Sequence, residues 1–170
     1  VLACVRDEFA RRGPQLLHWS EAARQLRNRL AFVHRYLGAP WPDVSDAVLR
    51  ELDADWLGPE FARVADGASL RSLDLVPALQ RLLPWPEAAG LADLVPEYLQ
   101  VPTGSKIHIE YPDAGDADAP ARCSVKLQEC FGMLDTPRLV GGRAPLVMQL
   151  LSPAQRPVAI TEDLASFWQQ

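Results

Sequence analysis

The chain has 170 residues, 48% of them hydrophobic, which is enough to bury one ordinary core or two small ones. We therefore expect a folded chain rather than a disordered one. Its net charge of −5 argues against a protein dedicated to nucleic-acid binding. No apolar run reaches the ~18 residues of a membrane span and no signal-like leader is visible, so neither membrane insertion nor secretion is expected.

The cysteines and prolines indicate the cellular compartment and the length of the secondary-structure elements. The three cysteines, Cys4, Cys123 and Cys130, form no CxxC pair, and an odd count of free thiols suits a reducing compartment, so we expect a cytoplasmic protein. The 15 prolines predict short elements, because proline cannot donate a backbone hydrogen bond.

Two helices are predicted at the start of the chain. Val1, Val5 and Phe9 follow helical spacing, and Gly13-Pro14 ends that helix. A second helix follows Ser20 as its N-cap and ends at Gly38. The chain begins within or just before a helix and ends on an apolar stripe, so we expect both ends to be cut from a longer protein.

The second helix carries a basic face. Arg24, Arg27, Arg29 and Arg35 lie mostly off its apolar stripe and are expected to project outward. A solvated or domain-facing surface is the preferred interpretation, because no aromatic residue is interleaved with these arginines. Phosphate contact, through Arg24 and Arg27, is the alternative.

Short helices fill the rest of the first half. Asp43 or Ser45 can cap a helix that ends at Gly58-Pro59. Further short helices are predicted near residues 60–65, 75–83 and 87–94. Residues 1–97 are therefore expected to form a helical region.

The pattern changes to period two near Tyr98. Apolar residues alternate on either side of Pro102-Thr-Gly-Ser105, which predicts a hairpin, and residues 112–120 predict an exposed, mobile loop. Residues 125–131 suit a short helix or a strand passing into one.

The last predicted elements are two strands and a helix. The apolar run from Leu146 to Leu151 predicts a buried strand, and Val158 with Ile160 predicts a last short strand. Thr161 is predicted to cap a terminal helix. The fold class is thus α+β: a short-helix half, then a small mixed β-sheet domain over residues 98–170 with one or two helices.

Motifs for catalysis are missing from the sequence. Gly104-Ser105-Lys106 is the nearest approach to a phosphate-binding loop, but it joins two strands rather than entering a helix. The cysteines and histidines lack metal-ligand spacing, and no nucleophile elbow occurs. We therefore predict no catalytic residue, no cofactor site and no metal site in this chain.

Basic residues near glycine turns are the candidate nucleic-acid contacts. Arg138 and Arg143 flank Gly141-Gly142, and Arg156 precedes Val158. Guanidinium groups pair with phosphate, and glycine permits close backbone approach. A glycine hairpin with solvated arginines is an equal alternative. Lys106 completes the candidates in this half.

Five segments carry a family resemblance. They are Trp41-Pro-Asp-Val-Ser-Asp46, Val101-Pro-Thr-Gly-Ser-Lys-Ile107, Val125-Lys-Leu-Gln-Glu-Cys-Phe-Gly132, Leu150-Leu-Ser-Pro-Ala-Gln-Arg-Pro157 and Asp163-Leu-Ala-Ser-Phe-Trp168. Together they resemble the C-terminal region of HrpB-type bacterial DExH-box ATP-dependent helicases, and the likeness spans nearly the whole chain.

The resemblance implies a parent helicase that hydrolyses ATP, with Mg, in motor domains upstream of Val1. This chain would then be an accessory domain that packs on those domains and helps engage single-stranded RNA or DNA. The alternative is a protein-interaction or purely structural module, which the acidic middle segment favours.

Overall fold

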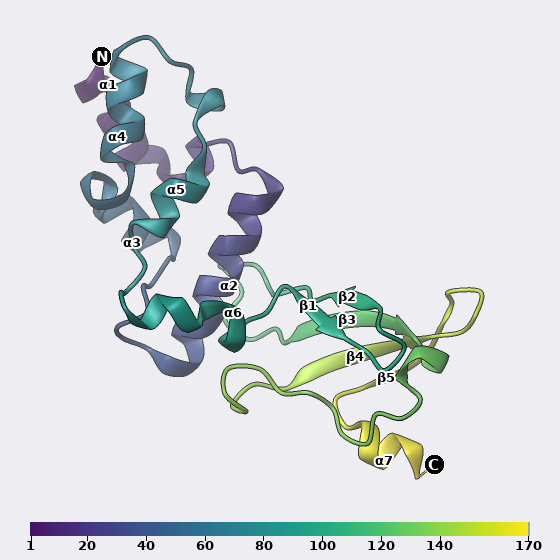
Figure 1. Ribbon diagram of the computed structural model, residues 1–170. Coiled ribbons are helices and arrows are strands. Elements are labelled where there is room, and N and C mark those ends of the chain that lie inside the picture. The colour runs from purple at the N-terminus through teal and green to yellow at the C-terminus, as the bar shows by residue number, and fades with distance from the viewer. Residues whose placement is uncertain (170) are drawn as a thin grey trace. The chain divides into compact units, whose positions relative to one another are not determined.

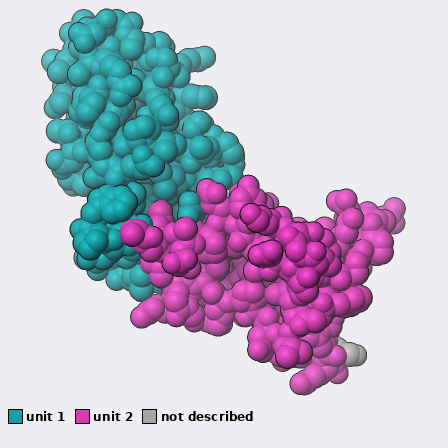
Figure 2. Space-filling view, viewed as in Figure 1, with its two compact units in different colours: residues 1–88, 113–115 teal, residues 89–112, 116–170 magenta. Residues whose placement is uncertain are grey.

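The computed structural model describes residues 1–169, and its backbone contacts divide them into two compact units (Figures 1 and 2). Unit 1 comprises Val1–Ala88 with Asp113–Gly115, and unit 2 comprises Ala89–Pro112 with the chain from Asp116 onward. The predicted α+β class is confirmed, since helices fill the N-terminal half and small mixed sheets follow. The boundary drawn after residue 97 stays a prediction.

Unit 1 is built from helices. In chain order they are α1 (Leu2–Arg12), η1 (Gly13–Leu16), α2 (Glu21–Leu37), α3 (Asp46–Glu51), α4 (Asp53–Ala65), η2 (Leu70–Ser72) and α5 (Leu75–Gln80), where η denotes a 3-10 helix. The short helix η3 (Glu87–Gly90) then leads into unit 2.

Helix α2 begins and ends where the sequence predicts. The Ser20 hydroxyl accepts a hydrogen bond from the Ala23 amide, 3.2 Å away, and the helix ends at Gly38, whose φ of 64° favours glycine. The Ser45 hydroxyl caps α3 in the same way, while the Asp43 carboxylate accepts from the Ser45 amide.

The core of unit 1 forms around Trp56. Its ring centroid lies 6.4 Å from that of Phe9 and 6.1 Å from that of Trp19, and Phe9 in turn contacts Phe61 edge-on. Trp56 is fully buried, and its indole Nε1 donates to the Leu49 carbonyl. Four aromatic side chains, from α1, the segment before α2, and α4, therefore share one apolar centre.

The prediction that a helix ends at Gly58-Pro59 is wrong. The break lies at Leu52, between α3 and α4, and α4 continues through Pro59. Proline excludes most preceding residues from helical geometry by contact with their Cβ, and Gly58 has none. Beyond the proline, burial of Glu60 and Phe61 on the face of Trp56 favours continuation of the helix.

Unit 2 contains two small sheets with short helices. Its elements are α6 (Leu91–Leu94), β1 (Tyr98–Gln100), β2 (Lys106–His108), β3 (Ala121–Lys126), η4 (Leu127–Cys130), β4 (Leu146–Leu151), β5 (Pro157–Thr161) and α7 (Leu164–Trp168). Strands β1 and β2 form the predicted antiparallel hairpin. Strand β4 lies between β3, which is parallel to it, and β5, which is antiparallel.

A β-bridge joins the hairpin to the three-stranded sheet. Glu110 and Arg122 exchange two backbone hydrogen bonds of 2.7 and 2.9 Å, and β2 lies beside β3. Residues paired in this way point their side chains to the same side of the strands.

The three-stranded sheet has one buried side. Burial alternates residue by residue along β3 and β4, as expected for strands with one face on a core. The buried side chains of these two strands are Ala121, Cys123, Val125, Leu146, Met148 and Leu150. The sheet therefore leaves its other side open.

The terminal helix is capped differently from the prediction. Asp163, not Thr161, is the N-cap of α7, and its carboxylate accepts from the Ser166 amide and hydroxyl. The Thr161 hydroxyl instead accepts from the Asp163 amide. Hydrogen bonding to the ionised form lowers the pKa of Asp163.

Residues 112–120 form no helix or strand, and the Ala114 amide in this loop donates to the Asn28 side chain of α2. The mobility expected of the loop stays a prediction. Within residues 1–169, no helix is both long and apolar enough to cross a membrane.

Candidate nucleic-acid interface

The predicted contact residues fall in both units. Arg24 and Arg27 lie in unit 1, and Lys106, Arg138, Arg143 and Arg156 lie in unit 2.

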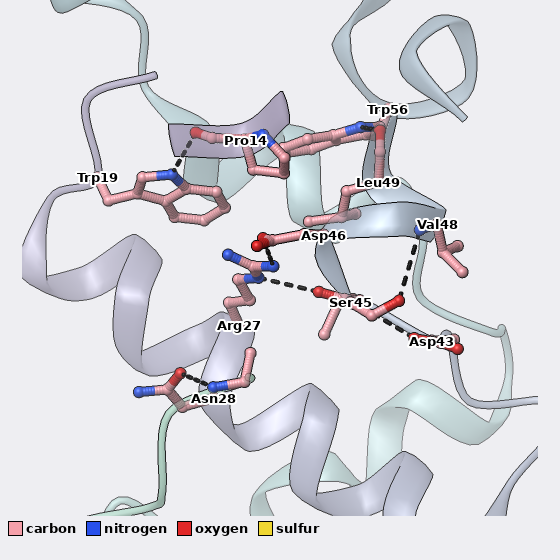
Figure 3. A network of polar contacts seen from close by, with 12 residues as sticks. Pro14, Trp19, Arg27, Asn28, Asp43, Ser45, Asp46, Val48, Leu49 and Trp56 are labelled. Atoms are coloured by element: carbon pink, nitrogen blue, oxygen red, sulfur yellow. Dashed lines mark hydrogen bonds and ion pairs between the residues drawn. The ribbon is translucent and has the colours of Figure 1, made fainter. Parts of the chain in front are cut away.

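Arg27 holds two helices together, so its predicted outward projection is wrong. The guanidinium donates to the Asp46 carboxylate at 2.8 Å and to the Val44 carbonyl at 2.9 Å, and it lies 5.0 Å from the Trp19 ring centre (Figure 3). Its side chain is only 15% exposed. No local sequence pattern indicates this role, because Asp46 lies 19 residues from Arg27 along the chain.

Arg24 does lie on the surface, as predicted for α2. It forms an ion pair of 3.2 Å with Glu21, one helical turn earlier. Arg35, further along α2, lies over the Phe32 ring at 5.1 Å. Arg24, Arg27 and Arg35 of this helix thus have partners within unit 1.

Arg138 and Arg143 flank a tight turn that precedes β4. Leu139 and Ala144 pair across this turn, which passes through Gly141 and Gly142 with φ of 61° and 87°. The Arg138 Nε donates to the Gly142 carbonyl at 2.8 Å, and Arg143 Nη1 donates to the Val140 carbonyl. Both guanidinium groups therefore bond to their own turn.

Arg156 lies at the other end of β4. It belongs to the turn after Leu151, whereas the turn of residues 139–144 comes before Leu146 (Figure 1). Strand β4 between them has six residues, or about 20 Å at ~3.3 Å per residue. The structure does not bring Arg156 together with Arg138 and Arg143.

The open side of the three-stranded sheet carries cations that the sequence analysis missed. Arg122, Ser124 and Lys126 alternate with the buried residues of β3. Val147, Gln149 and Leu151 lie opposite them on β4, and Ser124 donates to Gln149 across the strands. We call this side of the sheet, together with Ile160 of β5, the open face.

Lys106 and Arg156 lie at the same end of the sheet as Lys126. Because Glu110 pairs with Arg122 in antiparallel sense, moving back along β2 to Lys106 corresponds to moving forward along β3 to Lys126. Lys126 is the register partner of Leu151, the last residue before the turn of Arg156. Three cations therefore gather at one end.

The cations of this surface form no ion pair within the described residues, although Glu110 is the bridge partner of Arg122 on the neighbouring strand. Among the described residues, the side chains of Lys106, Arg122, Lys126 and Arg156 make no hydrogen bond or ion pair, and β3, β4 and β5 contain no acidic residue. The nearby Glu129 carboxylate accepts instead from Ser105, at 2.7 Å. Cations of this kind are available to phosphate.

A signal for the open face was present in the sequence. From Ala121 to Lys126, small or apolar residues alternate with Arg122, Ser124 and Lys126 at period two. The element predicted from the sequence begins only at Val125, near the end of β3, and so does not assign Arg122 and Lys126 to one face of a strand.

The buried side of the sheet offers no nucleophile. Burial raises the pKa of Cys123 to about 12 and that of Cys130 to about 11, so both thiols stay protonated at neutral pH. Within residues 1–169, no three His, Cys, Asp or Glu side chains are grouped to hold a metal ion. The arrangement offers charge and surface rather than reactive groups.

Comparisons with known proteins agree on the family. The family model for the ATP-dependent helicase C-terminal region of HrpB matches residues 56–170. The ATP-dependent RNA helicase HrpB of Escherichia coli K12 is 41% identical over 169 residues, which are 99% of this chain and 20% of that protein.

Two crystal structures of E. coli HrpB, one described as a DExH-box NTPase and the other as a DEAH/RHA helicase, superpose on 96% of this chain. Their TM-scores are 0.85 and 0.79, at 39% and 36% identity. The chain spans about a fifth of the length of these relatives. With matches over most of its length in sequence and fold, the chain belongs to the HrpB family of ATP-dependent helicase C-terminal regions.

Proposed function

We propose that this chain is the accessory C-terminal domain of an ATP-dependent RNA helicase and that its open face contacts the phosphate backbone of the RNA. The observation that carries the proposal is the set of unpaired cations, Lys106, Arg122, Lys126 and Arg156, on or beside a sheet without acidic residues. Such contacts add affinity and leave base sequence unread.

The proposal divides the work between this domain and the rest of the parent protein. ATP and Mg bind in upstream motor domains, on which this domain packs, and the parent acts in the cytoplasm. This chain itself catalyses nothing, in keeping with the lack of a phosphate-binding loop in its sequence.

A salt titration of the 170-residue chain tests the proposal. Fluorescence anisotropy with a labelled single-stranded RNA of about 20 nucleotides gives the affinity at each salt concentration. Four phosphate contacts predict a slope of log K against log salt of about −3, at ~0.7 per contact for single strands. Replacing Arg122 and Lys126 by alanine should reduce that slope by about 1.4.

A charge-matched control separates the open face from unit 1. The pair Arg24→Ala and Arg71→Ala removes the same charge from unit 1 and should leave affinity and slope unchanged. The pair Arg138→Ala and Arg143→Ala tests the glycine turn, whose arginines stay candidates. If the unsubstituted chain does not bind RNA at low salt, the proposal is overturned in favour of a protein-interaction or structural module. An open-face variant that binds as tightly as the unsubstituted chain would overturn it as well.

A further inference from the structure

An exposed aromatic pair lies on the hairpin beside the open face. Tyr98 of β1 and His108 of β2 are register partners, and their ring centroids are 5.7 Å apart at an angle of 64°. Tyr98 is 51% exposed, which is unusual for so large a ring, and His108 is also exposed. The hairpin therefore presents aromatic surface to solvent.

The pair lies on the same side of the strands as the cations. His108 and Glu110 are exposed while Ile109 between them is buried, so the two point the same way. Glu110 pairs with Arg122, and paired residues share a side. The sequence of side chains across the strands is thus Tyr98, His108 and then the cations of β3.

Core packing does not account for this pair. The other side of the same hairpin presents Leu99 and Ile107, which are partners in register and are both less exposed than Tyr98. An edge-on aromatic pair contributes to hairpin stability. Such a contact leaves about half of Tyr98 open to solvent, where a second flat ring can stack.

Glu110 sets a limit on the size of the positive surface. Its carboxylate is exposed on the same side, next to Arg122. Phosphate contact is therefore stronger at Lys106 and Lys126, at the far end of these strands, than at Arg122, and a neutral base is favoured near His108 and Tyr98.

We infer that the Tyr98–His108 pair is a stacking site for an unpaired base, so that the open face selects single-stranded RNA over duplex. The inference rests on the proposed function, because it needs the phosphates to lie on the cations. In a duplex the bases are stacked on one another and offer no free ring face, whereas a single strand can place one base on Tyr98 and its phosphates on Lys106 and Lys126.

The test compares Tyr98→Ala with Tyr98→Phe in the 170-residue chain. Tyr98→Ala should weaken binding of single-stranded oligouridine by about tenfold or more and leave the salt slope unchanged, because a stacked base carries no counterion with it. Tyr98→Phe, which keeps the ring, should bind within about twofold of the parent chain. Phe131→Ala removes another exposed ring of unit 2 and should change nothing.

The outcomes separate this inference from the proposed function. If Arg122→Ala with Lys126→Ala weakens binding while Tyr98→Ala binds as tightly as the unsubstituted chain, the stacking inference is wrong and the phosphate contact stands. If an RNA duplex binds as tightly as the single strand, stacking is likewise wrong. If the parent chain binds no RNA at low salt, both fail. A melting temperature measured for each variant ensures that the compared chains are folded.

Discussion

The two units differ in how their basic side chains pair with acidic ones. In unit 1, Arg24 pairs with Glu21, Arg27 with Asp46, and both Arg63 and Arg81 with the buried Glu60. In unit 2, Lys106, Arg122, Lys126 and Arg156 have no such partner among the described residues. A count of basic residues favours unit 1, whose first 40 residues hold seven arginines against three acidic residues. Unit 2 gathers unpaired cations around one sheet, whereas Arg6, Arg50 and Arg71, which form no ion pair within the described residues of unit 1, lie in three separate helices.

An unpaired cation, rather than a cluster of cations, therefore marks a candidate surface for phosphate. An arginine already paired with a carboxylate must lose that interaction before it can bind a ligand.

Thiol reactivity should separate the units most strongly. Cys4 of unit 1 is exposed, while Cys123 and Cys130 are buried in unit 2 with pKa values raised from 9.0 to about 12 and about 11. Compared with a thiol of pKa 9.0, these pKa values lower the thiolate fraction at pH 8 by about a thousandfold for Cys123 and about a hundredfold for Cys130. An aromatic disulfide reagent should therefore modify Cys4 rapidly and the other two only slowly.

The Cys4→Ser variant is the control for this reaction, since it should abolish the fast phase. Adding urea should release the two slow thiols as unit 2 unfolds. Three thiols that react at one common rate in the folded chain would contradict the burial of Cys123 and Cys130.

Removal of the Trp56 ring should destabilise unit 1 selectively. Trp56 is fully buried and contacts Phe9 and Trp19, so Trp56→Ala should cost about 3–5 kcal/mol. Urea unfolding followed by far-ultraviolet circular dichroism reports the helices, and release of the Cys123 and Cys130 thiols reports unit 2. The urea midpoint of the circular dichroism signal should fall, and the urea midpoint of thiol release should not change.

Trp85→Ala is the matched control, because that ring is 69% exposed and its loss should cost less than about 0.5 kcal/mol. Equal shifts of both midpoints in the Trp56 variant would mean that the two units unfold as one.

The buried ion pair of unit 1 gives the next effect. Glu60 is fully buried, and Arg81 Nη1 contacts both of its carboxylate oxygens and also the Trp56 carbonyl. Arg81→Met leaves the carboxylate without this partner and should cost about 3 kcal/mol in urea unfolding. Adding Glu60→Leu should recover much of that loss, because the buried charge is then gone as well.

Arg63 still lies 3.4 Å from Glu60, so it moderates the single variant. Arg63→Met alone should cost less than about 1 kcal/mol, since that guanidinium is 57% exposed. A larger effect at Arg63 than at Arg81 would reverse our assignment of the principal partner.

Elements with local signals could be predicted from the sequence. The Ser20 cap and the end at Gly38 define α2, the turn at Pro102–Ser105 defines the β1–β2 hairpin, and the run from Leu146 defines β4. Each depends on residues adjacent in sequence. The end predicted at Gly58-Pro59 was also a local inference, and it failed because burial of Glu60 and Phe61 outweighs the proline.

The candidate site depended on distant residues and was predicted less well. The role of Arg27 follows from Asp46, Val44 and Trp19, which only the packing of helices brings near. The open face follows from the register of β3 with β4 and from the single bridge at Glu110. No spacing in the sequence encodes that register, although the alternation within β3 would have revealed its two cations.

The smallest predicted effect concerns the pH dependence of unit 1. The Ser45 amide donates to the Asp43 carboxylate at 2.9 Å, and this bond, opposed by partial burial, lowers the pKa of Asp43 below its ordinary value of 3.8. The ionised form is therefore favoured in the folded state. Its contribution to stability is present above about pH 4 and is lost as the pH falls through the lowered pKa.

Asp43→Asn keeps an oxygen that can accept from the Ser45 amide and removes only the charge. The variant should be slightly less stable than the parent chain at pH 7, by a few tenths of a kcal/mol, and equal to it near pH 2. Asp118→Asn, in the exposed loop before β3, should show no such pH-dependent difference. If the difference in stability between Asp43→Asn and the unsubstituted chain grew as the pH fell, the folded state would favour the protonated carboxyl. The pKa of Asp43 would then be raised rather than lowered.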